Sequence, residues 1–290
     1  MNILGISAYY HDAAAVLVQG DEVVVGAEEE RFTRRKHDSG FPKNAIRFCL
    51  DYVRLPAAEL DLVVFYDKPL KKLERALQTA RPFGAQAQAM VNWHVSNFVH
   101  RESRIAEDVA ELLGVAVPVE FCEHHLSHAA SVFYISPFER AAILTVDGVG
   151  EWATTGLYVG TPTGIEQLKE IRYPHSLGLF YATMTAYLGF EVNEGEYKVM
   201  GLASYGKPTY DDEVAQLMTL NEDGSFRNNL DFYSYMYDDS VMYTPKLVEL
   251  LGPARAPNEP VTERHMNIAA SMQKLCEEGL LNLARAARRE

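Results

Sequence analysis

The feature that most constrains the fold is an internal repeat with an offset of 140 residues. Sliding the chain by this offset superposes identical residues: Ile3, Leu4, Ala13, Leu17 and Gly20 fall on Ile143, Leu144, Ala153, Leu157 and Gly160. Both copies read as an apolar strand, a polar loop, a second strand, a turn and a third strand. Chance similarity between apolar strands is the alternative. The shared layout favours two similar lobes, each opening with a strand–loop–strand hairpin.

The periodicity of apolar residues predicts an α/β fold around these hairpins, with a first lobe over 1–137 and a second over 138–290. Strands are expected over 2–7, 13–19, 22–27, 62–66 and 115–122, and again over 167–171. Helices are expected from Pro42, over 70–113 with an interruption at 81–84, over 126–134, from Leu179, after Gly195 and over 262–290. Pro118 cannot donate to a sheet, so the strand over 115–122 is expected either to lie at an edge or to have a bent start. The last helix is expected to bury an apolar stripe of Ile268, Met272, Leu275, Leu280 and Leu283.

Composition narrows the class of protein. The 27 basic and 40 acidic residues give a net charge of −13, which disfavours binding to nucleic acid because phosphates attract Lys/Arg-rich faces. No stretch approaches the roughly 20 apolar residues of a membrane span, and no signal peptide is recognisable. The three cysteines are far apart and form no disulfide framework. We therefore expect a reduced, cytoplasmic protein without a membrane or nucleic-acid partner.

Three of the nine histidines stand in the segment EHHLSH at 123–128. His124 and His128 are four residues apart, so on a helix both imidazoles project from one face and can reach one metal ion. The alternative is a helix start where histidines merely form hydrogen bonds. Asp147, in the first loop of the second lobe, is expected to add a carboxylate oxygen across a cleft between the lobes. Mixed nitrogen and oxygen donors suit iron, manganese or zinc better than calcium. Iron is the metal we expect first, and magnesium is a further option.

Polar and glycine-rich loops form a second group of candidates. The first loop of each lobe could approach a phosphate, since glycine exposes backbone amides and a nearby carboxylate can hold a metal. The glycine-flanked segment at 195–201 could hold a ribose or phosphate, although its glycines could serve helix packing instead. The candidates for holding a nucleotide are Asp12, Gly148, Gly150, Glu196, Lys198 and Gly201.

Two further side chains could take part in a reaction. His11 precedes Asp12 in the first loop and could act as a general base beside an orienting carboxylate. A solvated loop histidine is the alternative. Lys36 lies in the charged loop 28–40, which reads either as a solvated charge run or as a contact for an anionic substrate group.

A set of motifs follows in order along nearly the whole chain. They are YHD at 10–12, EEERF at 28–32, KHD at 36–38, GFP at 40–42, HHLSHAA at 124–130, VDGVGE at 146–151, SLGL at 176–179 and GEYKVMGLA at 195–203. With these motifs the chain resembles the carbamoyltransferases of nodulation and antibiotic biosynthesis, the NodU/CmcH type. Only the stretch 207–262 matches loosely.

The resemblance implies an actin-like ATPase superfold joined to a C-terminal YrdC-like domain. That domain makes carbamoyl-adenylate from carbamoyl phosphate and ATP, and the actin-like part transfers the carbamoyl group to an acceptor hydroxyl of a sugar or natural product. The family is similar to the subunit that makes threonylcarbamoyl-adenosine on tRNA, whose metal is held by a His-x-x-x-His pair. By motif match, His124, His128 and Asp147 are implied as metal ligands. His11 is implied as the base at the acceptor hydroxyl, and Lys36 as a contact to carbamoyl or phosphate oxygens.

The end of the chain departs from the family pattern. Members continue past the last helix into a glycine-rich segment, a further aspartate ligand and the YrdC-like domain. We therefore expect a second lobe that is incomplete and a fragment that is inactive alone. A non-catalytic nucleotide- or metal-binding module is the alternative. The chain lacks the residues that are characteristic of a sugar kinase or of a metallopeptidase. The acceptor and the oligomeric state stay open, with a homodimer as one form.

Overall fold

The computed structural model describes residues 1–290, which divide into two compact units. The first unit comprises 1–76 and 91–127, and the second comprises 77–90 and 128–290. The first contains β1 (Asn2–Ser7), β2 (Ala14–Gln19), β3 (Glu22–Glu28), β4 (Leu62–Phe65), β5 (Val119–Phe121), α1 (Glu30–Thr33), α2 (Lys43–Val53) and α5 (Ile105–Leu113). The division passes through α3 (Pro69–Ala80), α4 (Gln88–His100) and α6 (His124–Phe133).

The second unit contains the remaining strands and helices. Its strands are β6 (Ala141–Val146), β7 (Ala153–Thr161), β8 (Gly164–Arg172), β9 (Met218–Leu220) and β10 (Phe226–Asn228). Its helices are α7 (Leu177–Tyr187), α8 (Glu196–Ala203), α9 (Asp211–Val214), α10 (Pro245–Leu251) and α11 (Glu263–Ala287). None of the helices combines the length and the apolar character that crossing a bilayer requires. The α/β fold class predicted from the sequence is thus confirmed.

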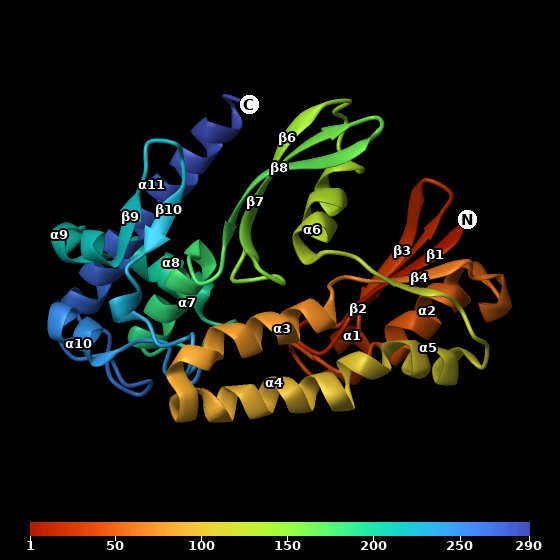
Figure 1. Cartoon of the computed structure of the whole chain (residues 1–290), viewed down its shortest axis with the longest axis horizontal. Coiled ribbons are helices and arrows are strands. Elements are labelled where there is room, and N and C mark those ends of the chain that lie inside the picture. The colour runs from red at the N-terminus through yellow and green to blue at the C-terminus, as the bar shows by residue number, and fades with distance from the viewer. The chain divides into compact units, whose positions relative to one another are not determined.

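The sheet of the first unit has the strand order β3-β2-β1-β4-β5 (Figure 1). β1, β2 and β3 are antiparallel neighbours, whereas β4 runs parallel to β1 and β5 runs parallel to β4. β5 forms one edge of the sheet, which is one of the two arrangements expected from Pro118. The strand is shorter than predicted and begins directly after this proline, so Pro118 lies outside it.

One face of this sheet forms the core of the first unit. Leu4, Leu17 and Val63 lie in register on β1, β2 and β4, and all three are fully buried. They pack with Ile46 of α2 and Val109 of α5 in one hydrophobic cluster. The alternation of buried and half-buried residues along β1 and β2 shows that one face is covered, and the shared cluster places α2 and α5 on it.

The second unit opens with a hairpin that repeats the first in detail. Leu4 pairs with Leu17 in β1–β2, and Leu144 pairs with Leu157 in β6–β7, so the pairing register is conserved at the offset of 140. The pairing with the third strand shifts immediately after Leu17 in one copy and immediately after Leu157 in the other. A shared register and a shared irregularity are not expected from chance similarity, which confirms the predicted repeat of hairpins.

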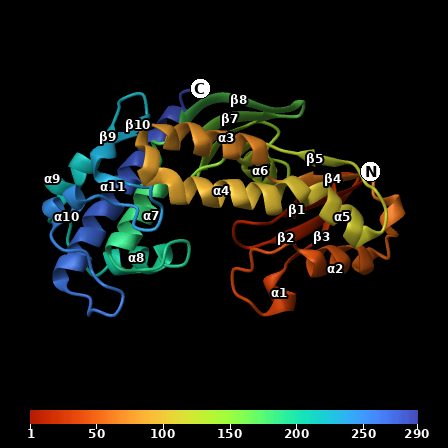
Figure 2. The ribbon, with the colours of Figure 1, turned by 60° about the horizontal axis from the view of Figure 1, so that its bottom comes forward.

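Both faces of β7 are covered, which explains why nearly all of its residues are buried. On one face, Phe133 of α6 packs with Ile143 and Tyr158. Gly160 makes this approach possible, because a Cβ atom there would lie 2.5 Å from the Phe133 ring. On the other face, α7 and α8 pack beside α11 in the largest core of the protein (Figure 2).

The predicted stripe of α11 needs one correction. Ile268, Met272 and Leu283 are buried as expected, but Leu280 is 38% exposed. The small Gly279 is buried there instead, against Leu177. Successive residues of an α-helix point about 100° apart, so Leu280, one residue after Gly279, lies away from the buried face.

Buried Glu29 fixes the start of α2. Its side chain is 2% exposed and accepts hydrogen bonds from the amides of Asn44 and Ala45, at 3.0 and 2.8 Å, and from Asn44 Nδ2. These amides belong to the first turn of a helix, where no intrahelical acceptor exists. A negative charge there also complements the helix dipole.

Replacing Glu29 with alanine is therefore expected to destabilise the protein by about 2 kcal/mol, because buried amides lose their acceptor. The matched control is Glu28→Ala, which removes a half-exposed carboxylate paired with Arg31 and should cost less than about 1 kcal/mol. Urea unfolding followed by circular dichroism measures both. Equal midpoints for the two variants would contradict the capping role.

Candidate functional site

Two histidines and one aspartate meet near the junction of α6 and β6. His124 and His128 lie one turn apart on α6, and His128 Nε2 is 3.3 Å from Asp147 Oδ2. One ligand atom of each of the three residues lies within 4.8 Å of the other two. The structure thus brings together the three residues that the sequence singled out as metal ligands.

The local fold explains how Asp147 is placed. β6 ends at Val146, and Asp147 follows as the first residue of the turn before β7, where its amide donates to Thr154 O at 2.9 Å. The carboxylate is oriented by its own turn, since Oδ1 accepts the amide of Gly148 at 2.6 Å. α6 packs on the same hairpin through Phe133, which holds the imidazole of His128 close to this turn.

The N-terminus of α7 supports this turn from the other side. Ser176 caps the helix by accepting the amide of Leu179 at 2.9 Å, and its hydroxyl donates to Gly148 O at 2.7 Å. Gly178 must be glycine for the contact to form, because a Cβ atom would lie 2.5 Å from Gly148 N and 2.6 Å from Asp147 O. The segment SLGL at 176–179 therefore holds the backbone of the turn that carries Asp147.

Substitution of Gly178 with alanine should push the turn at Asp147 away from α7. We expect metal affinity at the histidine–aspartate cluster to fall about tenfold, comparable to the loss of an outer support of a metal ligand. Gly201→Ala is the control, because a Cβ atom there meets nothing within 4 Å. Titration of divalent metal into the two variants measures the difference, and equal affinities would show that the contact at Gly178 is not needed.

The donor set fits a transition metal. Two imidazole nitrogens and one carboxylate oxygen are typical ligands of iron, manganese and zinc, whereas calcium prefers oxygen alone. The side chains of His128 and Asp147 are partly exposed, at 50% and 35%, so a further ligand from solvent or substrate has access. His125, between the two histidines, is buried and takes no part in the cluster.

A second group of polar residues lies at one end of the first sheet. His11 Nδ1 is 2.9 Å from Asp12 Oδ2, and His37 Nδ1 is 2.8 Å from Asp12 Oδ1. Burial alone would raise the pKa of Asp12, but the hydrogen bonds from His37 and His11 outweigh it and lower the pKa below its usual value. Asp12 is therefore a carboxylate at neutral pH, held between two imidazoles.

The two loops that carry these residues are joined by backbone hydrogen bonds. The amide of Tyr9 donates to Ser39 O at 2.7 Å, and the amide of Ala13 donates to Asp38 O at 2.8 Å. Lys36 lies in the second of these loops and is exposed. The loop after β1 and the charged loop at 34–40 thus form one polar surface.

The remaining candidates for holding a nucleotide lie in the second unit. Glu196 accepts the amides of Asn193 and Gly195, which makes it a cap of its own loop, and Lys198 lies over the Tyr197 ring at 5.6 Å. Gly150 is buried and donates to Ala153 O at 2.9 Å. Glu196 and Gly150 thus bind the backbone of their own loops, while exposed Gly201 leaves open space beside α8.

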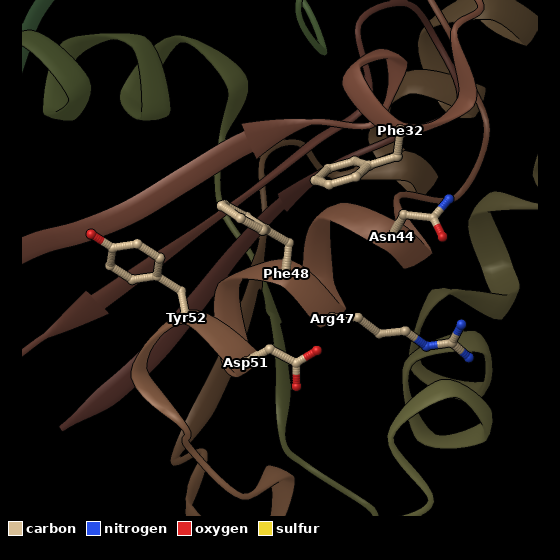
Figure 3. A pocket seen from close by; sticks show the side chains of 6 residues that line it. All are labelled: Phe32, Asn44, Arg47, Phe48, Asp51 and Tyr52. Atoms are coloured by element: carbon tan, nitrogen blue, oxygen red, sulfur yellow. The ribbon is translucent and has the colours of Figure 1, made fainter.

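A row of aromatic side chains on the first unit was not predicted from the sequence. Phe32, Phe48 and Tyr52 are each more than a third exposed, with ring centroids 5.5 and 6.0 Å apart (Figure 3). They line a cavity of about 470 Å³ together with Asn44, and the Arg47 guanidinium points away from the rings. The spacing of Phe48 and Tyr52, four residues apart on α2, was the available signal.

The family described as "Carbamoyltransferase N-terminus" matches residues 2–290. "Uncharacterized protein sll1178" of Synechocystis is 45% identical over 97% of this chain and 47% of its own length. "Nodulation protein NolNO" of Sinorhizobium fredii is 32% identical over 96% of this chain and 38% of its own length. The chain thus spans less than half of either curated relative.

Among solved structures, the chain is similar to the Ppx/GppA phosphatase of Aquifex aeolicus. The likeness covers 99% of this chain and 93% of that one, with 12% identity and a TM-score of 0.36.

Proposed function

The chain belongs to the carbamoyltransferase N-terminus family, and from this membership we propose that it is the part of an O-carbamoyltransferase that transfers the carbamoyl group to an acceptor hydroxyl. The acceptor would be a sugar or a natural product. The observation that supports the proposal most directly is the cluster of His124, His128 and Asp147. The resemblance implies these three residues as metal ligands, and their ligand atoms lie within 4.8 Å of one another. The duplicated hairpins agree with the actin-like superfold that the resemblance implies.

We propose that a divalent metal, iron in first place, binds His124, His128 and Asp147. When bound, it would supply positive charge for the phosphate that leaves with the nucleotide. The carbamoyl donor would be carbamoyl-adenylate, made from carbamoyl phosphate and ATP by a YrdC-like domain as partner. Asp12, Gly148, Gly150, Glu196, Lys198 and Gly201 are the residues proposed to contact the nucleotide.

In the transfer step, His11 would take the proton of the acceptor hydroxyl at Nε2. The acceptor oxygen then forms a bond to the carbamoyl carbon, and the bond from that carbon to the phosphate oxygen of the adenylate breaks, releasing AMP. A carbamoyl carbon is a poor electrophile, so a good leaving group is needed. The exposed ammonium of Lys36 would contact the phosphate or carbamoyl oxygens. His11 is the base of this step, and a positioned base typically contributes about 10²–10⁴-fold to the rate.

To test the proposal, the chain is combined with a YrdC-like domain, carbamoyl phosphate, ATP and a panel of hydroxylated acceptors. We expect acceptor-dependent release of AMP, with carbamoylated product identified by mass spectrometry. His11→Gln should lower turnover at least about a hundredfold while metal content stays unchanged. If ATP or metal raises the melting temperature but no acceptor is carbamoylated, the chain is a non-catalytic binding module.

A further inference from the structure

We propose that His37 is a positioning residue, which acts through Asp12 to hold His11 in the tautomer and orientation required of a base. No role for His37 follows from the motif match, and the inference rests on the proposed function of His11. Its basis is the chain of hydrogen bonds His37 Nδ1–Asp12 Oδ1 and Asp12 Oδ2–His11 Nδ1, at 2.8 and 2.9 Å.

The charge state of Asp12 decides which atoms carry the protons. A carboxylate can only accept, so the Nδ1 atoms of both His11 and His37 must donate to it. In neutral His11 this leaves Nε2 without a proton, as an acceptor for a hydroxyl proton. Asp12 therefore selects one of the two neutral tautomers of His11.

His37 reaches Asp12 through Nδ1 alone, because its Nε2 atom is buried and has no hydrogen-bond partner. His37 thus occupies one oxygen of Asp12 and leaves the other for His11.

The backbone is shaped to make this arrangement. Asp12 and His37 have positive φ angles of 47° and 55°, which non-glycine residues adopt only when other contacts hold them. One such contact is the hydrogen bond from the amide of His37 to Glu30 Oε2, at 2.9 Å. The backbone bonds of Tyr9 and Ala13 to the loop of His37 fix the distance between the two histidines.

Donor atoms of Asp12, Glu30 and His37 also lie within 4.8 Å of one another, which raises the question of a second cation site. Hydrogen bonds to His37 already occupy the carboxylate oxygens of Asp12 and Glu30 that would bind a cation. Asp12 Oδ1 accepts the Nδ1–H of His37, and Glu30 Oε2 accepts its backbone amide. We therefore assign the cluster to positioning of His11.

The experiment compares two variants that both tolerate a positive φ angle. In His37→Asn the amide group can donate to Asp12 from nearly the position of Nδ1, whereas His37→Gly keeps the backbone conformation and removes the donor. Nitrogen-15 NMR of the histidine-labelled chain reports the tautomer of His11, and His11→Gln identifies its signals. We expect the Nδ1–H tautomer of His11 in the wild type and in His37→Asn, and a mixture of tautomers in His37→Gly.

Turnover in the coupled carbamoylation assay provides the second measurement. His37→Gly should lower kcat about tenfold without changing KM for carbamoyl phosphate or ATP, and His37→Asn should restore most of the loss. A His11 spectrum that is the same in all three proteins overturns the inference. If the spectra change as expected but no protein transfers a carbamoyl group, the positioning of His11 stands and the proposed function fails.

Discussion

Replacing His128 with alanine is expected to abolish stoichiometric metal binding by this chain. The wild type should hold close to one divalent ion per chain after loading with iron(II) under anaerobic conditions. His128→Ala and His124→Ala each remove one of three donors, and Asp147→Asn removes the negative charge of the third. We expect the affinity to fall by more than about a hundredfold in each variant, beyond the range typical of lost outer supports. Elemental analysis after gel filtration measures the metal content.

Thermal unfolding gives an independent measurement of the same site. A ligand at about 100 times its Kd stabilises the folded state by about 2.7 kcal/mol, so metal should raise the Tm of the wild type and leave that of the three variants unchanged. His100→Ala is the matched control, because this histidine is exposed at the end of α4. Metal content in the three variants equal to that of the control would show that the cluster does not bind the ion.

The two histidines proposed to bind a metal could be identified from the sequence because their spacing is local. A separation of four residues on a helix places His124 and His128 on one face whatever the rest of the chain does. The pairing of β1–β2 and β6–β7 was predictable for a similar reason, since each hairpin is formed by neighbouring strands. Asp147 followed from its place at the end of β6 in the repeat.

The support of Asp12 by His37 could not be predicted in the same way. The two residues are 25 positions apart on different loops, and their contact depends on two left-handed backbone conformations. No periodicity reports such geometry, and a charged loop usually signals only a solvated surface. The stretch from α9 to α10 was equally hard to interpret, because its elements are too short to show a period.

A buried group of charges in the first unit gives the prediction with the largest effect on stability. The ammonium of Lys72 on α3 lies 2.7 Å from Asp67 Oδ2 and 2.8 Å from Glu102 Oε1. Asp67 and Glu102 are 2% and 5% exposed. Burial acts to lower the pKa of Lys72, but the two carboxylates outweigh it and raise the pKa, so Lys72 stays charged between them.

Lys72→Met should therefore destabilise the first unit by about 3–5 kcal/mol, because it removes the ammonium that lies between two buried carboxylates. Lys71→Met is the matched control on the same helix. Lys71 is half exposed and pairs with Glu123 at 2.8 Å, and its loss should cost at most about 1 kcal/mol. Urea unfolding at pH 7 measures both variants, and similar losses in the two would contradict the assignment of a buried cluster.

The dependence on pH separates a charge effect from a packing effect of the same substitution. In the wild type, the stabilisation from Lys72 is present below its ordinary pKa of 10.5 and is lost only as the pH rises through its raised folded value. Burial already raises the pKa of Glu102 despite Lys72, and without that cation it should rise further. A carboxyl group with a raised folded pKa stabilises the protein below its unfolded pKa, and this contribution is lost as pH rises. The destabilisation by Lys72→Met should thus be larger at pH 8 than at pH 5, whereas a defect of packing alone would be the same at both.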